Sequence, residues 1–152
     1  MLRAWTAALL SVVFTAPLAQ AQQPQLTPHD QVRIAVQRIC PVSGKPLGEH
    51  GPPIKVRVGK ETVYLCCRGC LQGRINPQAW QQIHANFRAA QGICPVMKKP
   101  LPRNAKGAPV QGEMFYVCCP GCLRKIAANP QKYHQWLEGQ YRAALKKTAS
   151  PR

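Results

Sequence analysis

The chain has 152 residues, with 21 Lys and Arg against only 5 Asp and Glu, and a formal net charge of +16. So few carboxylates leave little material for acid–base catalysis. Because no Ser–His–Asp set or phosphate-binding loop is apparent either, we expect that the protein is not an enzyme. The basic residues are scattered and form no nucleic-acid-binding motif, so we expect no nucleic-acid partner. Their field is compatible with an anionic membrane surface or an acidic protein as partner.

Residues 1–21 have the features of a cleavable export signal. Arg3 precedes an apolar run over 7–16, and Ala19-Gln20-Ala21 has the small-x-small form of a cleavage site. The apolar run is too short to span a bilayer; the alternative is an uncleaved membrane anchor. We expect cleavage after Ala21 and a mature protein that is periplasmic or secreted.

Residues 22–38 are predicted to form a polar lead-in followed by a short helix. Thr27, Pro28 and Asp30 resemble a capping box, with Thr27 as the N-cap and Pro28 at the first helical position. The apolar residues that follow recur at helical spacing, which predicts a helix at about 28–38. Their β-branched content leaves a strand as the alternative.

All eight cysteines belong to two copies of one pattern, which we assign to residues 39–91 and 92–147, with a frayed tail at 148–152. Each copy contains Ile-Cys-Pro-Val, then Cys-Cys-x-Gly-Cys-Leu, then Asn-Pro. The cysteines are Cys40, Cys66, Cys67 and Cys70 in the first copy and Cys94, Cys118, Cys119 and Cys122 in the second. Because units of about 50 residues bury little core, we expect the cysteines to stabilise them through a metal or disulfides.

The remaining pattern predicts a loop, a hairpin and a helix in each copy. In the first copy, a Gly- and Pro-rich loop precedes alternating strands at 54–58 and 61–65, joined by a two-residue turn. The cysteine turn and a short helix follow, and Asn76-Pro77 opens an amphipathic helix. The second copy repeats this plan, with a hairpin at about 108–117. We therefore predict an α+β fold of two small tandem treble-clef-like ββα cysteine-cluster units connected by amphipathic helices.

The cysteine spacing favours a thiophilic metal ion. Cys67 and Cys70 form a C-x-x-C pair that shares one face of a helical turn, and Cys66 and Cys70 share a face equally well if the helix begins one residue earlier. Cys40 is the distant ligand from the loop. Adjacent side chains on an extended strand point to opposite faces, so Cys66 and Cys67 converge only if the backbone bends. Three thiolates suit Cu(I) and four suit Zn(II), and the sequence leaves both open, with one ion per copy.

Both copies resemble the TRASH and YHS heavy-metal-binding domains, over residues 39–80 and 93–135. The motifs concerned are Cys40-Pro-Val-x-Gly-Lys-Pro, Val63-Tyr64-Leu65-Cys66-x3-Cys70 and Asn76-Pro77, with counterparts Cys94-Pro-Val, Phe115-Tyr116-Val117-Cys118-x3-Cys122 and Asn129-Pro130. The resemblance implies small ββα-type units that bind copper, zinc or related ions through Cys40, Cys66, Cys70, Cys94, Cys118 and Cys122. The chain departs from these families in two places. Ser43 and Met97 replace a second loop cysteine, while Cys67 and Cys119 replace a small polar residue and could supply the fourth ligand.

The expected function is thus metal binding, for metal handling, sensing or metal-stapled folding. The main alternative is a disulfide-stapled structural or interaction module without metal, because exported proteins meet an oxidising compartment. A thiol-redox enzyme is a third interpretation of the C-x-x-C pairs. Met97 could offer a thioether to copper, but Ser43 at the equivalent position favours packing or surface exposure. The four histidines do not repeat between copies, so we interpret them as surface or packing residues: His29, His50, His84 and His134.

Overall fold

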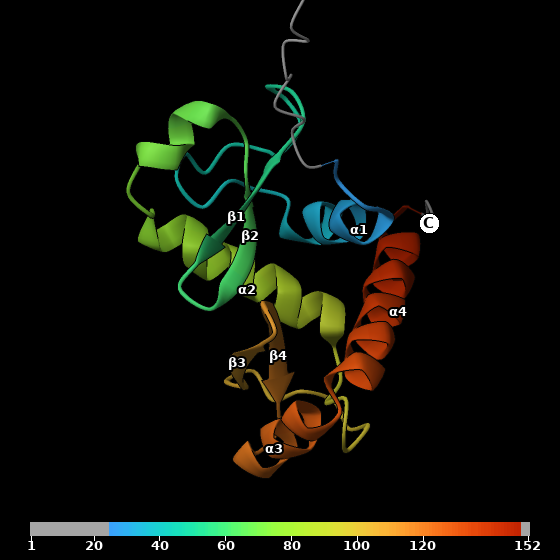
Figure 1. Ribbon diagram of the computed structural model, residues 1–152. Helices are drawn as coiled ribbons and strands as arrows, with labels where there is room; N and C mark the ends of the chain where they lie inside the picture. The colour runs from blue at the N-terminus through green and yellow to red at the C-terminus, as the bar shows by residue number, and fades with distance from the viewer. Residues whose placement is uncertain (1–24, 150–152) are drawn as a thin grey trace, which may run out of the picture.

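The computed structural model describes residues 25–149, so the predicted export signal at 1–21 lies outside the described residues. Within this range, four α-helices, one 3-10 helix and four short strands follow one another (Figure 1). They are α1 (Pro28–Gln37), β1 (Ile54–Val58), β2 (Glu61–Leu65), η1 (Arg68–Gln72), α2 (Pro77–Gln91), β3 (Lys106–Val110), β4 (Glu113–Val117), α3 (Pro120–Ala128) and α4 (Pro130–Ala149). None of these helices combines the length and apolar character that crossing a membrane requires.

Local sequence signals explain where the helices begin. Thr27 and Asp30 form the capping box at the start of α1: the Asp30 carboxylate accepts from the Thr27 amide (2.9 Å), and the Thr27 hydroxyl accepts from the Asp30 amide (3.2 Å). Asn76 caps α2 by accepting from the amides of Gln78 and Ala79. The segment 28–37 is therefore a helix and not the alternative strand. At the other end of the chain, α4 continues to Ala149, two residues into the predicted tail.

The strands form two separate antiparallel hairpins. In the first, Ile54 pairs with Leu65 and Val58 with Glu61, the strands having the predicted bounds. The second hairpin begins at Lys106, two residues before the predicted start, and turns at Gln111 and Gly112, both of which have positive φ. The structure is thus a mixed α and β fold with two small two-stranded sheets, as predicted at that level.

The short helix after each cysteine pair differs between the copies. In the first copy it is the 3-10 helix η1, which ends at Gln72 and has Gly73 as its C-cap. In the second it is the nine-residue α-helix α3, which begins at Pro120. The sequence accounts for this difference, because Pro is favoured at the first helical position and the residues after Leu123 are good helix formers, whereas Gly73 interrupts the corresponding segment of the first copy.

The two copies share one hydrophobic core. α1, α2 and α4 pack on one another, and α4 lies along one side of the molecule (Figure 1). Val36 of α1, Phe87 of α2, Phe115 of β4 and Leu137 of α4 are buried together with parts of α3. A smaller cluster around Cys40 contains the end of β2 and the start of η1. The helices therefore join the cysteine units into one packed body rather than merely connecting them.

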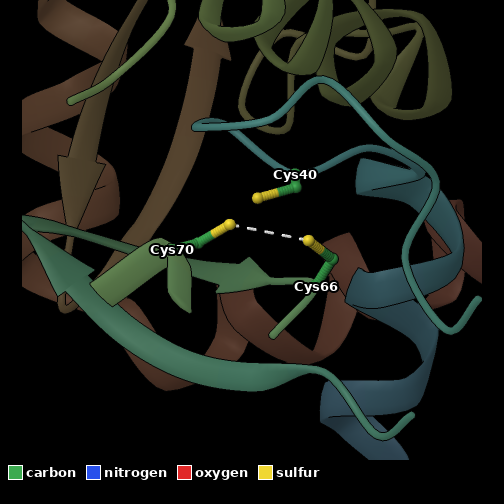
Figure 2. A group of neighbouring side chains, drawn as sticks. All are labelled: Cys40, Cys66 and Cys70. Atoms are coloured by element: carbon green, nitrogen blue, oxygen red, sulfur yellow. Dashed lines mark hydrogen bonds between the residues drawn. The ribbon is translucent and has the colours of Figure 1, made fainter. Parts of the chain in front are cut away.

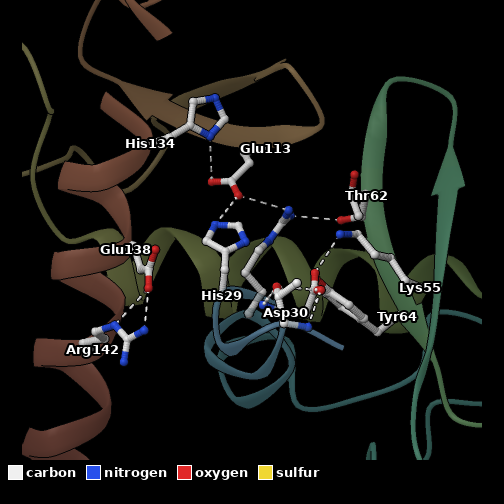
Figure 3. A network of polar contacts seen from close by, with 11 residues as sticks. His29, Asp30, Lys55, Thr62, Tyr64, Glu113, His134, Glu138 and Arg142 are labelled. Atoms are coloured by element: carbon white, nitrogen blue, oxygen red, sulfur yellow. Dashed lines mark hydrogen bonds and ion pairs between the residues drawn. The ribbon is translucent and has the colours of Figure 1, made fainter. Parts of the chain in front are cut away.

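A buried ionic network ties the copies together (Figure 3). Glu113 at the start of β4 is only 4% exposed. Its carboxylate lies 2.8 Å from His29 Nε2, 3.2 Å from Arg33 Nη1 and 3.3 Å from His134 Nδ1. Arg33 also donates to the Thr62 carbonyl in the other hairpin (3.0 Å). Because these residues come from α1, β2, β4 and α4, the network fixes the second hairpin against both helices and the first hairpin.

Candidate metal centres

A tight loop after α1 and another after α2 each present one cysteine. In the first, the Cys40 amide donates to the Lys45 carbonyl (2.8 Å) and the Gly44 amide to the Cys40 carbonyl (2.9 Å). The loop that begins at Cys94 repeats both bonds, at 2.8 Å each. Both cysteines are 0% exposed. We call these loops, residues 40–46 and 94–100, knuckle 1 and knuckle 2.

Each knuckle cysteine meets two further cysteines. The sets are Cys40, Cys66 and Cys70, called triad 1, and Cys94, Cys118 and Cys122, called triad 2; within each, all sulfurs lie within 4.8 Å of one another. In Figure 2 the three sulfurs of triad 1 point toward a common centre. Cys66 Sγ lies 3.6 Å from Cys70 Sγ, and Cys118 Sγ lies 3.9 Å from Cys122 Sγ. Thiolates that share a zinc ion through bonds of about 2.3 Å would lie about 3.8 Å apart, so both triads have metal-binding dimensions.

The end of the hairpin and the helix that follows it supply the other two cysteines of each triad. Cys66 follows β2 directly and Cys70 lies on η1, while Cys118 follows β4 and Cys122 lies on α3. Between the two cysteines of each pair the chain turns from the strand into the helix, which brings their sulfurs to within 3.6 Å in copy 1 and 3.9 Å in copy 2. The alternating strand pattern and the turn after it therefore explain how two cysteines reach the distant knuckle.

Cys67 and Cys119 lie beside the triads but are not members of them. Both are N-cap residues with extended backbone, at φ values of −162° and −155°. Alternation along a straight strand would place them on the face opposite the preceding cysteines, but the chain turns into the following helix at this point. Cys67 Sγ still lies 3.9 Å from Cys66 Sγ and 3.8 Å from Cys70 Sγ, and Cys119 Sγ lies 3.4 Å from Cys122 Sγ.

All eight cysteines are free thiols in this structure. The sulfur–sulfur contacts of 3.4 to 3.9 Å are far longer than a disulfide bond of about 2.05 Å. The described residues thus contain clustered thiols at metal-binding distances and no pair at bonding distance.

The knuckle cysteine ionises most readily in each triad. Burial alone raises the pKa of Cys40, but hydrogen bonds from the Ser43 and Cys66 amides and the Ser43 hydroxyl outweigh it and lower the pKa to about 7. Burial and hydrogen bonds with Cys66 and Cys40 raise the pKa of Cys70 to about 12. Triad 2 has the same order: backbone amides lower the pKa of its knuckle cysteine against burial, and burial raises that of its helix cysteine. A metal ion that binds three thiolates must therefore displace protons.

Histidines and Met97 take no part in either triad. His29 and His134 contact Glu113, and His84 contacts Tyr116. His50 lies on an exposed loop, and Met97 at the tip of knuckle 2 is 48% exposed. The groups of potential ligands found among the described residues are made of cysteine alone.

Sequence reasoning missed the glutamines that hold the knuckles. Gln37 and Gln91, the last residues of α1 and α2, are 0% and 1% exposed. Gln37 bonds to Tyr64 in the hairpin of copy 1, and Gln91 bonds to Tyr116 in the hairpin of copy 2. The signal was present in the sequence, because Gln-x-Ile-Cys occurs in both copies at the same place. The helix before each knuckle is therefore part of the repeated unit.

Comparison with protein-family models, with curated proteins and with solved structures finds no match to this chain. These comparisons neither support nor oppose the resemblance to TRASH and YHS domains. The two cysteine triads are therefore the features of the chain that indicate a function.

Proposed function

We propose that the protein is an exported metal-binding protein with two tandem treble-clef-like units of TRASH or YHS type. Each triad binds one thiophilic ion, Cu(I) or Zn(II). The observation that carries this proposal is that three cysteines from three separate segments converge twice, once in each copy. The bound ions serve metal handling or sensing, or they stabilise the fold.

Burial and ligand chemistry support a metal over free thiols. Cys40, Cys66 and Cys70 are all buried and have their sulfurs directed at one another. Thiolates are soft ligands that select Cu(I), Zn(II) and similar ions over hard cations. A shared cation stabilises closely spaced thiolates, which otherwise repel one another once ionised.

The two ions differ in the number of thiolates that they prefer. Three-coordinate binding by a triad suits Cu(I). Zn(II) needs a fourth ligand, and the Cys67 sulfur, 3.8 Å from that of Cys70, is the nearest candidate in copy 1. Replacing the bound ion with Co(II) distinguishes a three-thiolate site from a four-thiolate site. Tetrahedral coordination of Co(II) by four thiolates gives intense visible absorption bands. Loss of these bands in Cys67→Ser would assign the fourth ligand in copy 1.

Elemental analysis of the exported protein tests metal binding directly. We expect two equivalents of zinc or copper, and thiols that react only after a chelator is added. Cys70→Ser and Cys122→Ser should each reduce the content to one equivalent, while His50→Ala, which changes an exposed loop residue, should retain two. Metal-free protein with all cysteines oxidised would support the disulfide-stapled module instead. Metal-free protein with eight reactive thiols would contradict both functions.

The export step has a separate test. The intact mass of the protein recovered from the periplasmic fraction or the medium should match a chain that begins at Gln22. A protein that stays in the cytoplasm with residues 1–21 attached would contradict export without affecting the metal assignment. Metal content should be measured on the exported form, because its compartment decides which ions the thiols meet.

A further inference from the structure

The two triads differ in their access to solvent. Cys40, Cys66 and Cys70 of triad 1 are 0%, 2% and 9% exposed. In triad 2 the knuckle and helix cysteines are similarly buried, but Cys118 is exposed, and so is the neighbouring Cys119. The equivalent residues of copy 1 are buried and half-buried. An external ligand can therefore approach the sulfurs of triad 2 from one side, whereas protein surrounds those of triad 1.

A set of short-range contacts closes triad 1. The Asn76 amide, just after the η1 segment, donates to the Pro41 carbonyl in knuckle 1 (2.8 Å). Gly73 packs so closely on Val42 that an added Cβ would lie 2.4 Å from Val42 Cγ1. The Ser43 hydroxyl lies 3.4 Å from the Cys66 sulfur. These contacts bind knuckle 1 to the segment that follows its cysteine turn and cover the centre.

Copy 2 uses the corresponding groups differently. The amide of Asn129, which matches Asn76, donates to the Ile126 carbonyl at the end of α3 (3.2 Å). Knuckle 2 has the half-exposed Met97 where knuckle 1 has Ser43, and Lys98 lies over the Trp136 ring of α4 at 4.2 Å. Knuckle 2 is thus held from the α4 side, and the side that carries Cys118 stays open.

We infer that triad 2 is an exchange site, which passes its ion to external thiol ligands, and that triad 1 is a retention site. This inference rests on the proposed function and adds a division of roles between the copies. The ligand class is a thiol that is free to reach the Cys118 side, either a small thiol or an exposed cysteine of an acceptor protein. The observations that carry the inference are the exposure of triad 2 and the contacts that cover triad 1.

The exchange needs no oxidant or reductant. An acceptor thiolate forms one bond to the ion as the bond from the ion to Cys118 breaks. The proton that the acceptor thiol gives up is taken by the released cysteine thiolate. Repetition with the other two ligands transfers the ion, and its charge does not change. Protein that covers the centre hinders the first of these substitutions in triad 1.

Release kinetics in the full mature chain test the inference. The probe is protein loaded with two equivalents of Zn(II), or of Cu(I) where elemental analysis finds copper, mixed with excess chromogenic chelator. We expect two phases of one equivalent each, with rates that differ by roughly tenfold or more, since outer-shell contacts change metal affinity by about 10- to 100-fold. Cys122→Ser should remove the fast phase, and the matched Cys70→Ser should remove the slow phase.

Alkylation of the wild-type protein gives the same assignment without variants. Iodoacetamide is added during release, and the labelled peptides are identified by mass spectrometry. Cys118 and Cys122 should become labelled with the fast phase, and Cys66 and Cys70 with the slow phase. Equal labelling rates, or earlier labelling of copy 1, would overturn the division of roles while leaving two bound ions. A chain that takes up no ion would overturn the proposed function as well.

Discussion

Gln37 and Gln91 make the same three hydrogen bonds in the two repeats. Each side-chain amide donates through Nε2 to the carbonyl of the isoleucine before the knuckle cysteine and to the carbonyl of a strand tyrosine, Tyr64 or Tyr116. Its Oε1 accepts from that tyrosine's amide. All six distances lie between 2.6 and 3.0 Å. Since the knuckle and the end of the hairpin carry different cysteines of one triad, each glutamine sets the distance between them.

Replacing Gln91 with Leu tests this role. The substitution approximately keeps the side-chain volume but leaves the amide and carbonyl of Tyr116 unpaired in the core. We expect the free energy of unfolding to fall by about 2 to 4 kcal/mol, because buried polar groups lose their partners. Urea denaturation measures this, with Gln78→Ala, an exposed position on the same helix, as a control within about 0.5 kcal/mol. A Gln91→Leu variant as stable as the wild type would show that the bonds do not hold the knuckle.

Arg38 and Gly92 follow these glutamines and share a strained γ-turn backbone with positive φ, at φ and ψ of 66° and −43° and of 67° and −41°. A side chain in this conformation costs on the order of 1 to 3 kcal/mol. We therefore expect Arg38→Gly to raise the free energy of unfolding by about 1 kcal/mol and to raise the melting temperature with it. Gly92→Ala should lower the free energy of unfolding by about 1 kcal/mol.

Arg38→Ala is the control for the charge and side chain of Arg38. It removes both but keeps a Cβ at the strained position, so its stability should stay within about 0.5 kcal/mol of the wild type. Equal stabilisation by the Ala and Gly substitutions would indicate that charge, and not backbone conformation, is responsible.

Local patterns in the sequence were sufficient for most secondary structure. The first hairpin follows from strict alternation and the Gly59-Lys60 turn, and α2 follows from Asn76-Pro77 at its start. These signals act between residues close in the chain. Each copy has four cysteines, and only the family resemblance indicated which three of them form the triad. The alternation of side chains along a strand does not determine this choice, because it depends on how the backbone bends at Cys67. In the structure the Cys67 sulfur lies 3.9 Å from that of Cys66 and 3.8 Å from that of Cys70, but it does not belong to the group around Cys40.

The contacts between the copies could not be predicted in this way. Glu113 lies in the second copy and Arg33 on α1, 80 residues earlier, so no local period connects them. Absence of repetition between the copies indicates that the histidines are surface or packing residues, and it does not identify the carboxylate that His29 and His134 both contact. Non-repeating residues reflect the packing of one copy on the other, which breaks the symmetry of the repeat.

The buried carboxylate of Glu113 predicts a loss of stability in acid. Burial alone raises the pKa of Glu113, but hydrogen bonds from His134 and His29 and the charge of Arg33 outweigh it and hold the pKa well below its usual value of 4.5. The folded protein thus keeps the carboxylate charged at pH values where the unfolded chain binds a proton. The charged Glu113 carboxylate therefore contributes to the free energy of unfolding above pH 4.5, and this contribution is lost as the pH falls below that value.

Glu113→Gln should therefore change both the level and the slope of the stability profile. We expect it to cost about 3 to 5 kcal/mol near neutral pH, because Arg33 loses its buried partner, and to flatten the fall in stability below pH 4.5. Urea denaturation at a series of pH values measures both effects. Glu49→Gln removes the same charge from an exposed loop and should keep the wild-type profile. Parallel pH profiles for wild type and Glu113→Gln would contradict the assignment.

Removing the metal ions should loosen the first hairpin more than the second. The core around triad 1 consists of Leu65 and the triad cysteines, with Val56 and Ile54 packed against it. β4 is instead buried throughout its length in the main core. Because ligand binding stabilises the folded state by about 4 kcal/mol when the free ligand is 1,000 times its dissociation constant, loss of the ion from triad 1 removes a large part of the local stability.

Hydrogen exchange followed by mass spectrometry measures the two hairpins separately. Chelator should accelerate amide exchange in β1 and β2 much more than in β3 and β4, and it should lower the urea midpoint of the whole chain. A double variant, Cys70→Ser with Cys122→Ser, lacks a ligand in each triad and should show no response to chelator. The protein used for this test must hold two ions before the chelator is added. If the amide hydrogens of its first hairpin exchange equally fast before and after chelation, the ion in triad 1 has no structural role. The thiols alone would then be sufficient to pack this half of the molecule.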